Sequence, residues 1–228
     1  MSESILDKNL SRIIKIKICA SELESIDEIE DFCIQDINLM QRKLNIDLTE
    51  IVKIKNLKNL SLKFFEITDS VIESINQLEF IERIEFSMCK FKNKNKLFRN
   101  LKSLTVYNCE DFNINMIDTN IPLEELEIIH SGTVRVNELE VFKNLKKLKL
   151  SDCSIISIPN ISSFEYLEEL YLNNTDIQYE IDITNMKNLK YISLNGSSIG
   201  NKEEYVKKLY KQNINLAIEF EDDNLPID

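Results

Sequence analysis

The chain of 228 residues has little glycine and proline, three of each, and no tryptophan. So few glycines and prolines exclude a long flexible linker and a low-complexity segment. A single histidine, His130, is present, and the sequence has no glycine-rich phosphate loop, no H-E-x-x-H pair and no EF-hand calcium loop. We therefore expect no catalytic residues, no metal site and no cofactor.

Long apolar runs are also missing, which predicts that no transmembrane helix is present. The first residues lack the basic and apolar segments of a secretory signal. The five cysteines are scattered singly, which argues against a disulfide framework or a zinc site: Cys19, Cys33, Cys89, Cys109 and Cys153. These features predict a cytoplasmic location, although a signal trimmed before Met1 would leave secretion open.

Positive charge is in deficit, because the net charge is −11 and the pI is about 4.8. Binding to a phosphate backbone requires clustered cations, so we expect neither nucleic acid nor an anionic membrane as partner. The hydrophobic fraction of 43% nevertheless predicts a folded core.

What the sequence does contain is an internal repeat. The stretch from Phe142 to Ile199 holds three copies of one apolar pattern, the first reading Leu145-x-x-Leu148-x-Leu150-x-x-Cys153-x-Ile155, with a period of 22 residues. Projected backwards, the pattern gives nine copies that begin at 13, 34, 57, 81, 101, 123, 145, 167 and 189. Apolar residues at motif positions four and six predict a short strand with these side chains pointing inward.

This pattern resembles the leucine-rich repeat, with Cys, Thr or Ser at position nine, where the family most often has Asn. The 22-residue copies resemble those of the regulatory subunits of protein phosphatase-1 and of internalin-type bacterial surface proteins. The resemblance implies an α/β fold, a curved right-handed leucine-rich-repeat solenoid with a parallel β-sheet on its concave face and mixed helix, 3-10 and extended segments on its convex face. It also implies binding of a protein through the concave face.

We interpret the chain as a single domain, 1–228, because each repeat buries its apolar face only against its neighbours. Residues 1–12 are expected to cap the first repeat, 13–199 to form about nine repeats, and 200–228 to form a terminal cap of helix, strand and acidic tail. Helices are predicted from Asp69, as capping residue, to Leu78, over 22–32 in a similar way, and from Asn201 to about Gln212. Pro159 predicts an extended or tight-turn return, and alternation over 214–220 predicts a last strand.

The resemblance implies that the side chain at position nine hydrogen-bonds backbone groups of adjacent repeats. Its occupants are mostly small and polar: Ser21, Arg42, Phe65, Cys89, Cys109, Ser131, Cys153, Thr175 and Ser197. The alternative for Cys89 and Cys109 is a redox pair on neighbouring repeats. Arg42 and Phe65 break the series, so the N-terminal third is expected to be less regular.

Motif positions three, five and seven point away from the core. Charges alternate there and at position two, for example in Glu124, Lys146, Glu168 and Lys190. Opposite charges on adjacent strands predict a ladder that fixes strand order, and the alternative is a charged docking strip.

Apolar residues on the same face are the candidate binding residues, because a solvated sheet face does not require them. Met40, Tyr107, Ile129, Tyr171 and Tyr191 occupy outward positions, and Phe64, Met88 and His130 follow the strand ends. For Phe64 and Met88 the alternative is that they cover the edge of the core.

The sequence therefore predicts a protein-interaction scaffold or regulatory subunit, with a protein partner of unknown identity and a monomeric state favoured. The alternatives are an exported effector or surface receptor module with the same binding mode, and a self-assembling array.

Overall fold

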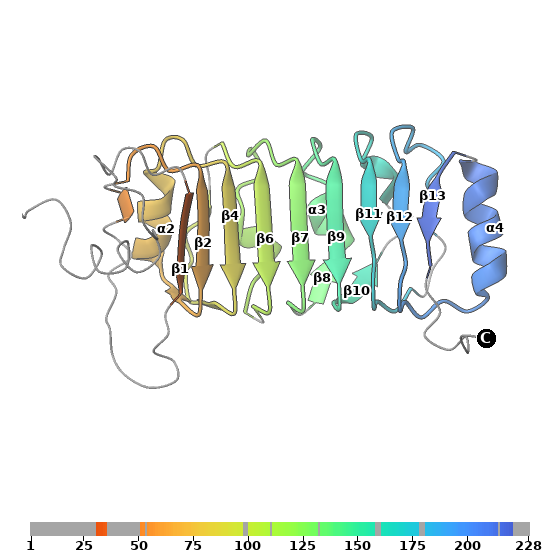
Figure 1. Cartoon of the computed structure of the whole chain (residues 1–228), viewed down its shortest axis with the longest axis horizontal. Helices are drawn as coiled ribbons and strands as arrows, with labels where there is room; N and C mark the ends of the chain where they lie inside the picture. Colours follow the sequence, from red (N-terminus) through yellow and green to blue (C-terminus); the bar gives the residue numbers. More distant parts are fainter. Residues whose placement is uncertain are drawn as a thin grey trace, which may run out of the picture.

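The computed structural model describes residues 31–35, 51–52, 54–97, 100–109, 111–131, 133–157, 161–177, 181–213 and 215–220. Within these residues, nine strands form one parallel sheet in which each strand lies beside the next along the chain (Figure 1). The strands are β1 (Asp31–Gln35), β2 (Asn59–Lys63), β4 (Arg83–Ser87), β6 (Ser103–Tyr107), β7 (Glu125–Ile129), β9 (Lys147–Ser151), β11 (Glu169–Tyr171), β12 (Tyr191–Ser193) and β13 (Ala217–Glu219).

The strand register follows the motif from the third copy onward. On β6, Leu104 pairs with Ile84 and Leu126 of the neighbouring strands, and Val106 pairs with Phe86 and Ile128 in the same way. All of these position-four and position-six side chains are buried. The predicted inward and outward faces of these strands are therefore confirmed.

One continuous core runs behind the sheet. The first motif position of every copy from Leu57 to Leu189 is buried, as are Phe142 and Phe164 from the segments that precede two of the strands. Each repeat thus contributes its apolar side chains to its neighbours, and stability comes from stacking.

The returning segments vary in structure, as predicted for the convex side. They comprise α2 (Asp69–Asn76), α3 (Val136–Leu139), the 3-10 helices η4 (Ile114–Met116) and η5 (Ile161–Ser163), the strand pair β3 (Glu66–Ile67) and β5 (Lys90–Phe91), and the pair β8 (Thr133–Arg135) and β10 (Ser154–Ser157). Figure 1 shows α3, β8 and β10 behind the sheet. This variety absorbs the different lengths of the repeats.

Helix α2 forms where the spacing of Val71, Ile72 and Ile75 predicted it, and these three side chains are buried. Asp69 does not cap this helix, because the N-cap residue is Thr68. The Asp69 carboxylate instead accepts the backbone N–H groups of Lys94 and Asn95 in the next repeat, at 2.6 and 2.7 Å. These hydrogen bonds lower the pKa of Asp69.

Helix α4 (Lys202–Gln212) lies at the C-terminal end of the stack (Figure 1). Its N-cap is Asn201, as predicted, whose side chain accepts the N–H of Glu204 at 3.2 Å. The Tyr205 hydroxyl accepts the buried N–H of Ile181 at 3.2 Å, and Leu209 is buried. These contacts hold the helix against the last repeat.

The last strand, β13, is shorter than the predicted 214–220 and pairs Ile218 with Ile192. Ile218 therefore lies further along the chain from Ile192 than the 22-residue period of the repeats, because α4 and its connection lie between β12 and β13.

The register of the second copy was wrong. The motif placed a strand over 36–40, but β1 spans Asp31–Gln35 and pairs Ile34 with Leu62. Two overlapping apolar series, one through Phe32 and Ile34 and one through Ile37 and Leu39, fit the motif, and pairing with β2 selects the first. A return helix over 22–32 is contradicted at its end, since Asp31 and Phe32 belong to the strand.

Several predictions fall outside the described residues. These are the N-terminal cap, the copy beginning at 13, Met40, Ser21, Arg42, the Pro159 turn and the acidic tail.

Candidate functional site

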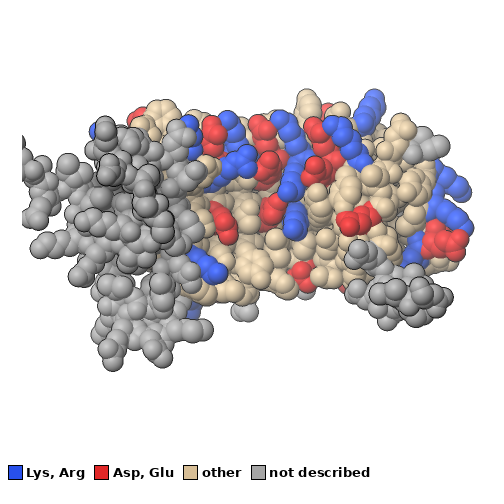
Figure 2. Space-filling model, viewed as in Figure 1, with Lys and Arg blue, Asp and Glu red and all other residues tan. Residues whose placement is uncertain are grey.

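The candidate site is the exposed side of the nine-stranded sheet, which we call the sheet face. It presents motif positions three, five and seven of each strand. Figure 2 shows charged side chains gathered along the upper part of this face, where the strands begin, and a largely uncharged lower part, where they end. The two parts offer different contacts.

The charged part is organised in pairs between neighbouring repeats. At motif position two, each of three lysines bonds the glutamate of the preceding repeat: Lys102 with Glu82 at 2.9 Å, Lys146 with Glu124 at 2.7 Å and Lys190 with Glu168 at 2.5 Å. These hydrogen bonds lower the pKa of Glu82 and Glu168 and raise that of Lys146. The contacts are those expected of a ladder that fixes strand order.

Within the strands the ion pairs do not join register neighbours on adjacent strands, which the sequence did not indicate. Lys147 Nζ lies 2.7 Å from Glu127 Oε1, although Lys147 is in register with Glu125. Arg83 reaches Glu125 at 3.5 Å across β6, where the intervening residue is the small Ser103. The length of the arginine and lysine side chains therefore determines which glutamate each of them pairs with.

Tyr171 and Tyr191 lie together at the C-terminal end of the sheet face. Their ring centroids are 5.2 Å apart and the rings are tilted by 48°. The Tyr171 hydroxyl donates to Glu169 Oε2 at 3.0 Å, and the Tyr191 hydroxyl donates to Glu219 Oε2. Burial is the main reason that the pKa of both tyrosines is raised to about 12, and the neighbouring carboxylates raise it further. Both hydroxyls are therefore protonated at neutral pH and can donate these hydrogen bonds. We call these four residues the tyrosine patch.

Two lysines of β9 approach the ring of Tyr171. Lys147 Nζ is 5.5 Å and Lys149 Nζ 5.9 Å from its centroid, within the range of a cation–π contact. The patch is thus bounded on this side by positive charge.

Tyr107, Ile129 and His130 form a second group, the central patch. Tyr107 and Ile129 are partners in register on β6 and β7. The Tyr107 ring packs edge-on against His130, with centroids 5.9 Å apart, and 36% of the tyrosine is exposed. His130 Nε2 lies 3.5 Å from Asp152 Oδ2. The outward residues Tyr107, Ile129, Tyr171 and Tyr191 therefore fall into two groups, which are separated by β9 with Lys147 and Lys149.

Phe64, Met88 and His130 occupy motif position eight, where the chain leaves the strand. Every described copy has a positive φ at this position: Phe64, Met88, Asn108, His130, Asp152, Asn174 and Gly196. The left-handed region is common for Asn, Asp, His and Gly but costs a bulky residue about 1–2 kcal/mol. The sequence interpretation missed this turn, although Asn, Asp or Gly at 108, 152, 174 and 196 was a signal for it.

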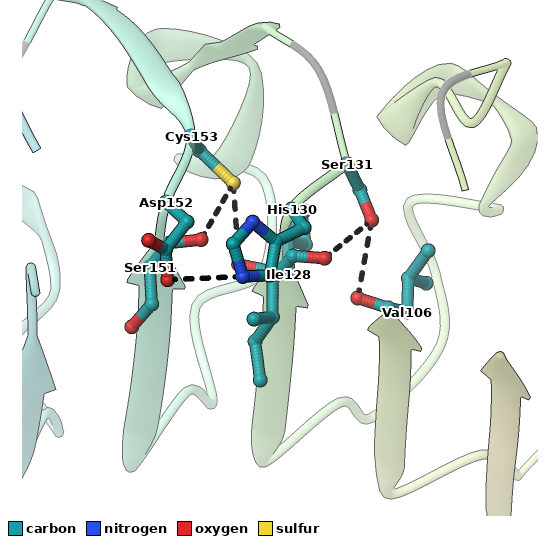
Figure 3. A network of polar contacts seen from close by, with 8 residues as sticks. Val106, Ile128, His130, Ser131, Ser151, Asp152 and Cys153 are labelled. Carbon is teal, nitrogen blue, oxygen red and sulfur yellow. Dashed lines mark hydrogen bonds and ion pairs between the residues drawn. The ribbon is translucent and has the colours of Figure 1, made fainter. Parts of the chain in front are cut away.

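Position nine forms the expected hydrogen-bond ladder (Figure 3). The Ser131 hydroxyl donates to Ile129 O at 2.7 Å, and the Cys153 thiol donates to Ser151 O at 3.2 Å and to Ile128 O at 3.4 Å. His130 meanwhile gives its backbone N–H to Ser151 O at 3.1 Å. The side chains at position nine thus tie each turn to the preceding strand.

Cys89 and Cys109 belong to the same ladder. The N–H of Cys89 donates to Cys109 Sγ at 3.2 Å, and the N–H of Cys109 donates to Ser131 Oγ at 3.1 Å. Both thiols are free and buried. Their contacts are those of the structural interpretation, in which the sulfur serves as a hydrogen-bonding group.

Ser131 and His130 do not form a catalytic arrangement. The Ser131 side chain is buried and directed at backbone oxygens, whereas the His130 ring lies beside Asp152 (Figure 3). The same ring also packs against Tyr107. Among the described residues, no cluster of histidine, cysteine and carboxylate side chains could hold a metal ion.

In the described part of the chain, no helix has the length and apolar character needed to cross a bilayer.

No protein-family model and no curated protein matches the sequence. Solved structures do match. Internalin C2 of Listeria monocytogenes is 17% identical with a TM-score of 0.65, and the match covers 94% of this chain and 93% of that one. Another internalin of Listeria monocytogenes is 18% identical with a TM-score of 0.56, and covers 78% of this chain and 52% of its own.

A leucine-rich-repeat protein of Leptospira interrogans is 19% identical with a TM-score of 0.53, covering 75% of this chain and 51% of its own. The chain thus matches about half the length of two of these proteins. At these identities the likeness establishes architecture. Together with the parallel stack and the recurring motif, it shows that the chain folds as a leucine-rich-repeat solenoid.

Proposed function

We propose that this protein binds another protein through the sheet face, as an interaction scaffold or regulatory subunit. The observation that carries the proposal is the pair of half-exposed tyrosines, Tyr171 and Tyr191, on a side of the sheet that contributes nothing to the core. Tyrosine is enriched in the centres of protein interfaces because its ring offers a large contact area at a small entropic cost.

The central patch supports the same proposal. Tyr107 is exposed and Ile129 half-buried. They are the last residues of β6 and β7, and the part of the face where the strands end is largely uncharged (Figure 2). Phe64 and Met88 continue this part towards β2 and are also half-buried, although their backbone conformation is unfavourable for such residues. An unfavourable conformation at a surface position is compatible with a binding role.

An exported effector or surface receptor module would use the same face. The likeness to two internalins supports this second candidate through its architecture. The free, buried thiols Cys89, Cys109 and Cys153 support a reducing compartment instead. A reading frame that continues upstream of Met1 into an apolar segment would favour the exported form.

The test is affinity capture from a lysate of the source organism, with mass spectrometry and then a binding titration of the captured protein. We expect a partner that the Tyr171→Ala/Tyr191→Ala variant binds at least tenfold more weakly, about 1.4 kcal/mol or more, as for interface anchor residues. Circular dichroism should be unchanged, because neither side chain belongs to the core.

The matched control is Tyr166→Ala/Tyr210→Ala, which removes two exposed tyrosines that lie outside the sheet strands. We expect this variant to bind as the wild type does. Equal loss in both variants, or full binding by the sheet-face variant, would contradict a binding role for the tyrosine patch. Light scattering of the free protein tests the expected monomeric state against self-assembly.

A further inference from the structure

The two glutamates on β7 form ion pairs within the chain, whereas the glutamates on β11 and β13 differ from them. Glu125 and Glu127 bond Arg83 and Lys147. Glu169 on β11 and Glu219 on β13 form no ion pair with a lysine or arginine among the described residues, and each accepts a tyrosine hydroxyl instead. A neutral hydroxyl stabilises a carboxylate without cancelling its charge, so the tyrosine patch remains negative.

Ring and carboxylate alternate across these strands. In one row of the register, Tyr171 is followed by Ser193 and Glu219, and in the adjacent row Glu169 is followed by Tyr191 and Ala217. The tyrosines and glutamates therefore surround positions held by two small residues. Ser193 is buried, and its hydroxyl donates to Asn173 Oδ1 at 2.7 Å. Ala217, by contrast, is exposed, so a side chain from outside can approach the Tyr191 ring over Ala217.

Within the chain, positively charged groups already lie next to one of the two tyrosine rings. Lys147 and Lys149 place their ammonium groups 5.5 and 5.9 Å from the centre of the Tyr171 ring. For the neighbouring ring of Tyr191, no such cation lies among the described residues, although Glu169 is its neighbour in register and Glu219 accepts its hydroxyl. The hydrogen bond from Tyr191 lowers the pKa of Glu219, which keeps that carboxylate ionised at neutral pH.

We propose that the tyrosine patch binds an arginine side chain presented by the protein partner, stacked on Tyr191 and bonded to Glu219 or Glu169. This inference rests on the proposed function and names the chemistry of the partner. A guanidinium group stacks on an aromatic ring and donates to a carboxylate in the same plane. Arginine suits the patch better than lysine, because an ammonium group is more strongly hydrated and has no planar face.

A direct test uses the peptide Ac-Gly-Gly-Arg-Gly-Gly-amide as probe, with the same peptide containing citrulline as the uncharged isostere. Binding is followed by NMR through the ring signals of Tyr171 and Tyr191. We expect saturable shifts with the arginine peptide, at a Kd on the order of millimolar for one exposed cation–π and carboxylate contact. The citrulline peptide should shift these signals at least roughly tenfold more weakly, as loss of the charge predicts.

Three variants identify the site. Tyr191→Ala should weaken arginine binding roughly tenfold and Glu219→Gln roughly threefold to tenfold. Tyr191→Phe keeps the ring, frees the Glu219 carboxylate from its hydroxyl donor, and should bind at least as well as the wild type. The control is Glu85→Gln, which removes a carboxylate from the same face at β4, away from the tyrosine pair, and should leave binding unchanged.

Equal shifts with the two peptides, equal loss in Glu85→Gln, or no saturable shift at about 50 mM probe would overturn the proposal. These outcomes can be distinguished from failure of the proposed function. A captured partner that requires Tyr171 and Tyr191 but shows no preference for arginine over citrulline would leave protein binding intact and remove the arginine assignment.

Discussion

At motif position eight the backbone has a positive φ, and glycine occupies this position in the last repeat. At Gly196 φ is +67°, and a Cβ placed there would meet Asn174 Oδ1 at 1.9 Å. Asn174 holds the same position one repeat earlier, with φ of +52°. Glycine therefore serves two needs here, the left-handed conformation and the space for a neighbouring side chain.

We expect Gly196→Ala to lower the free energy of unfolding by about 1–2 kcal/mol, because alanine is disfavoured at positive φ and Asn174 must move. Urea unfolding followed by circular dichroism measures the change. Gly200→Ala is the matched control, since a Cβ there meets nothing within 4 Å and its φ is not positive. A loss of stability in Gly200→Ala as large as that in Gly196→Ala would remove this explanation.

At the scale of elements, α4 completes the last repeat with polar as well as apolar contacts. The Tyr205 hydroxyl accepts the buried N–H of Ile181, and Gln212 Oε1 accepts the N–H of Ile183 at 2.7 Å. The helix thereby satisfies backbone groups that have no further repeat beside them.

Replacing Tyr205 by Phe removes the acceptor for the Ile181 N–H while keeping the buried ring. We expect the free energy of unfolding to fall by about 1–3 kcal/mol, the cost of an unsatisfied buried donor. Differential scanning calorimetry should show a lower Tm than for Tyr210→Phe, a change at an exposed tyrosine of the same helix. Equal Tm values for the two variants would mean that the hydrogen bond contributes nothing.

The elements also show where sequence interpretation succeeds. In the nine-stranded sheet, the strands from β2 to β12 were predictable because Leu, Ile, Val and Phe at motif positions one, four and six allow only one register with a buried face. β1 was not, because the apolar series through Ile34 and through Ile37 are both acceptable locally and only pairing with β2 distinguishes them. The local apolar pattern therefore predicts the bounds of a strand only where a single register buries its apolar side chains.

The candidate site was predictable in outline and unpredictable in its contacts. Alternation places Tyr107, Ile129, Tyr171 and Tyr191 on the outward face. The division into two patches depends on where long side chains reach, as with Lys147, which bonds Glu127 instead of its neighbour in register. Such diagonal contacts depend on rotamers, which residue spacing does not specify.

At the scale of the whole molecule, a repeat stack distributes stability along its length. Each repeat contacts mainly its neighbours, so damage at one end should weaken nearby repeats more than distant ones. The buried thiols of Cys89 and Cys153 lie in different repeats and can report on this gradient.

We expect Leu209→Ala, which opens the core beneath α4, to destabilise the C-terminal repeats by about 2–5 kcal/mol. Thiol labelling under native conditions, located by peptide mass spectrometry, should then accelerate more at Cys153 than at Cys89. Equal acceleration at both thiols would show that the array opens as one cooperative unit instead.

The left-handed turn at motif position eight has a consequence for the dimensions of the binding surface. From His130 to Gly196 this turn recurs every 22 residues, at 130, 152, 174 and 196, so the chain passes through equivalent points in successive repeats. Excising the segment between two such points would join matching backbone geometries and shorten the sheet by one strand spacing, about 4.8 Å. The separation of the central and tyrosine patches can therefore change only in whole strand spacings. A partner that contacts both patches would therefore have to match one of a discrete series of separations.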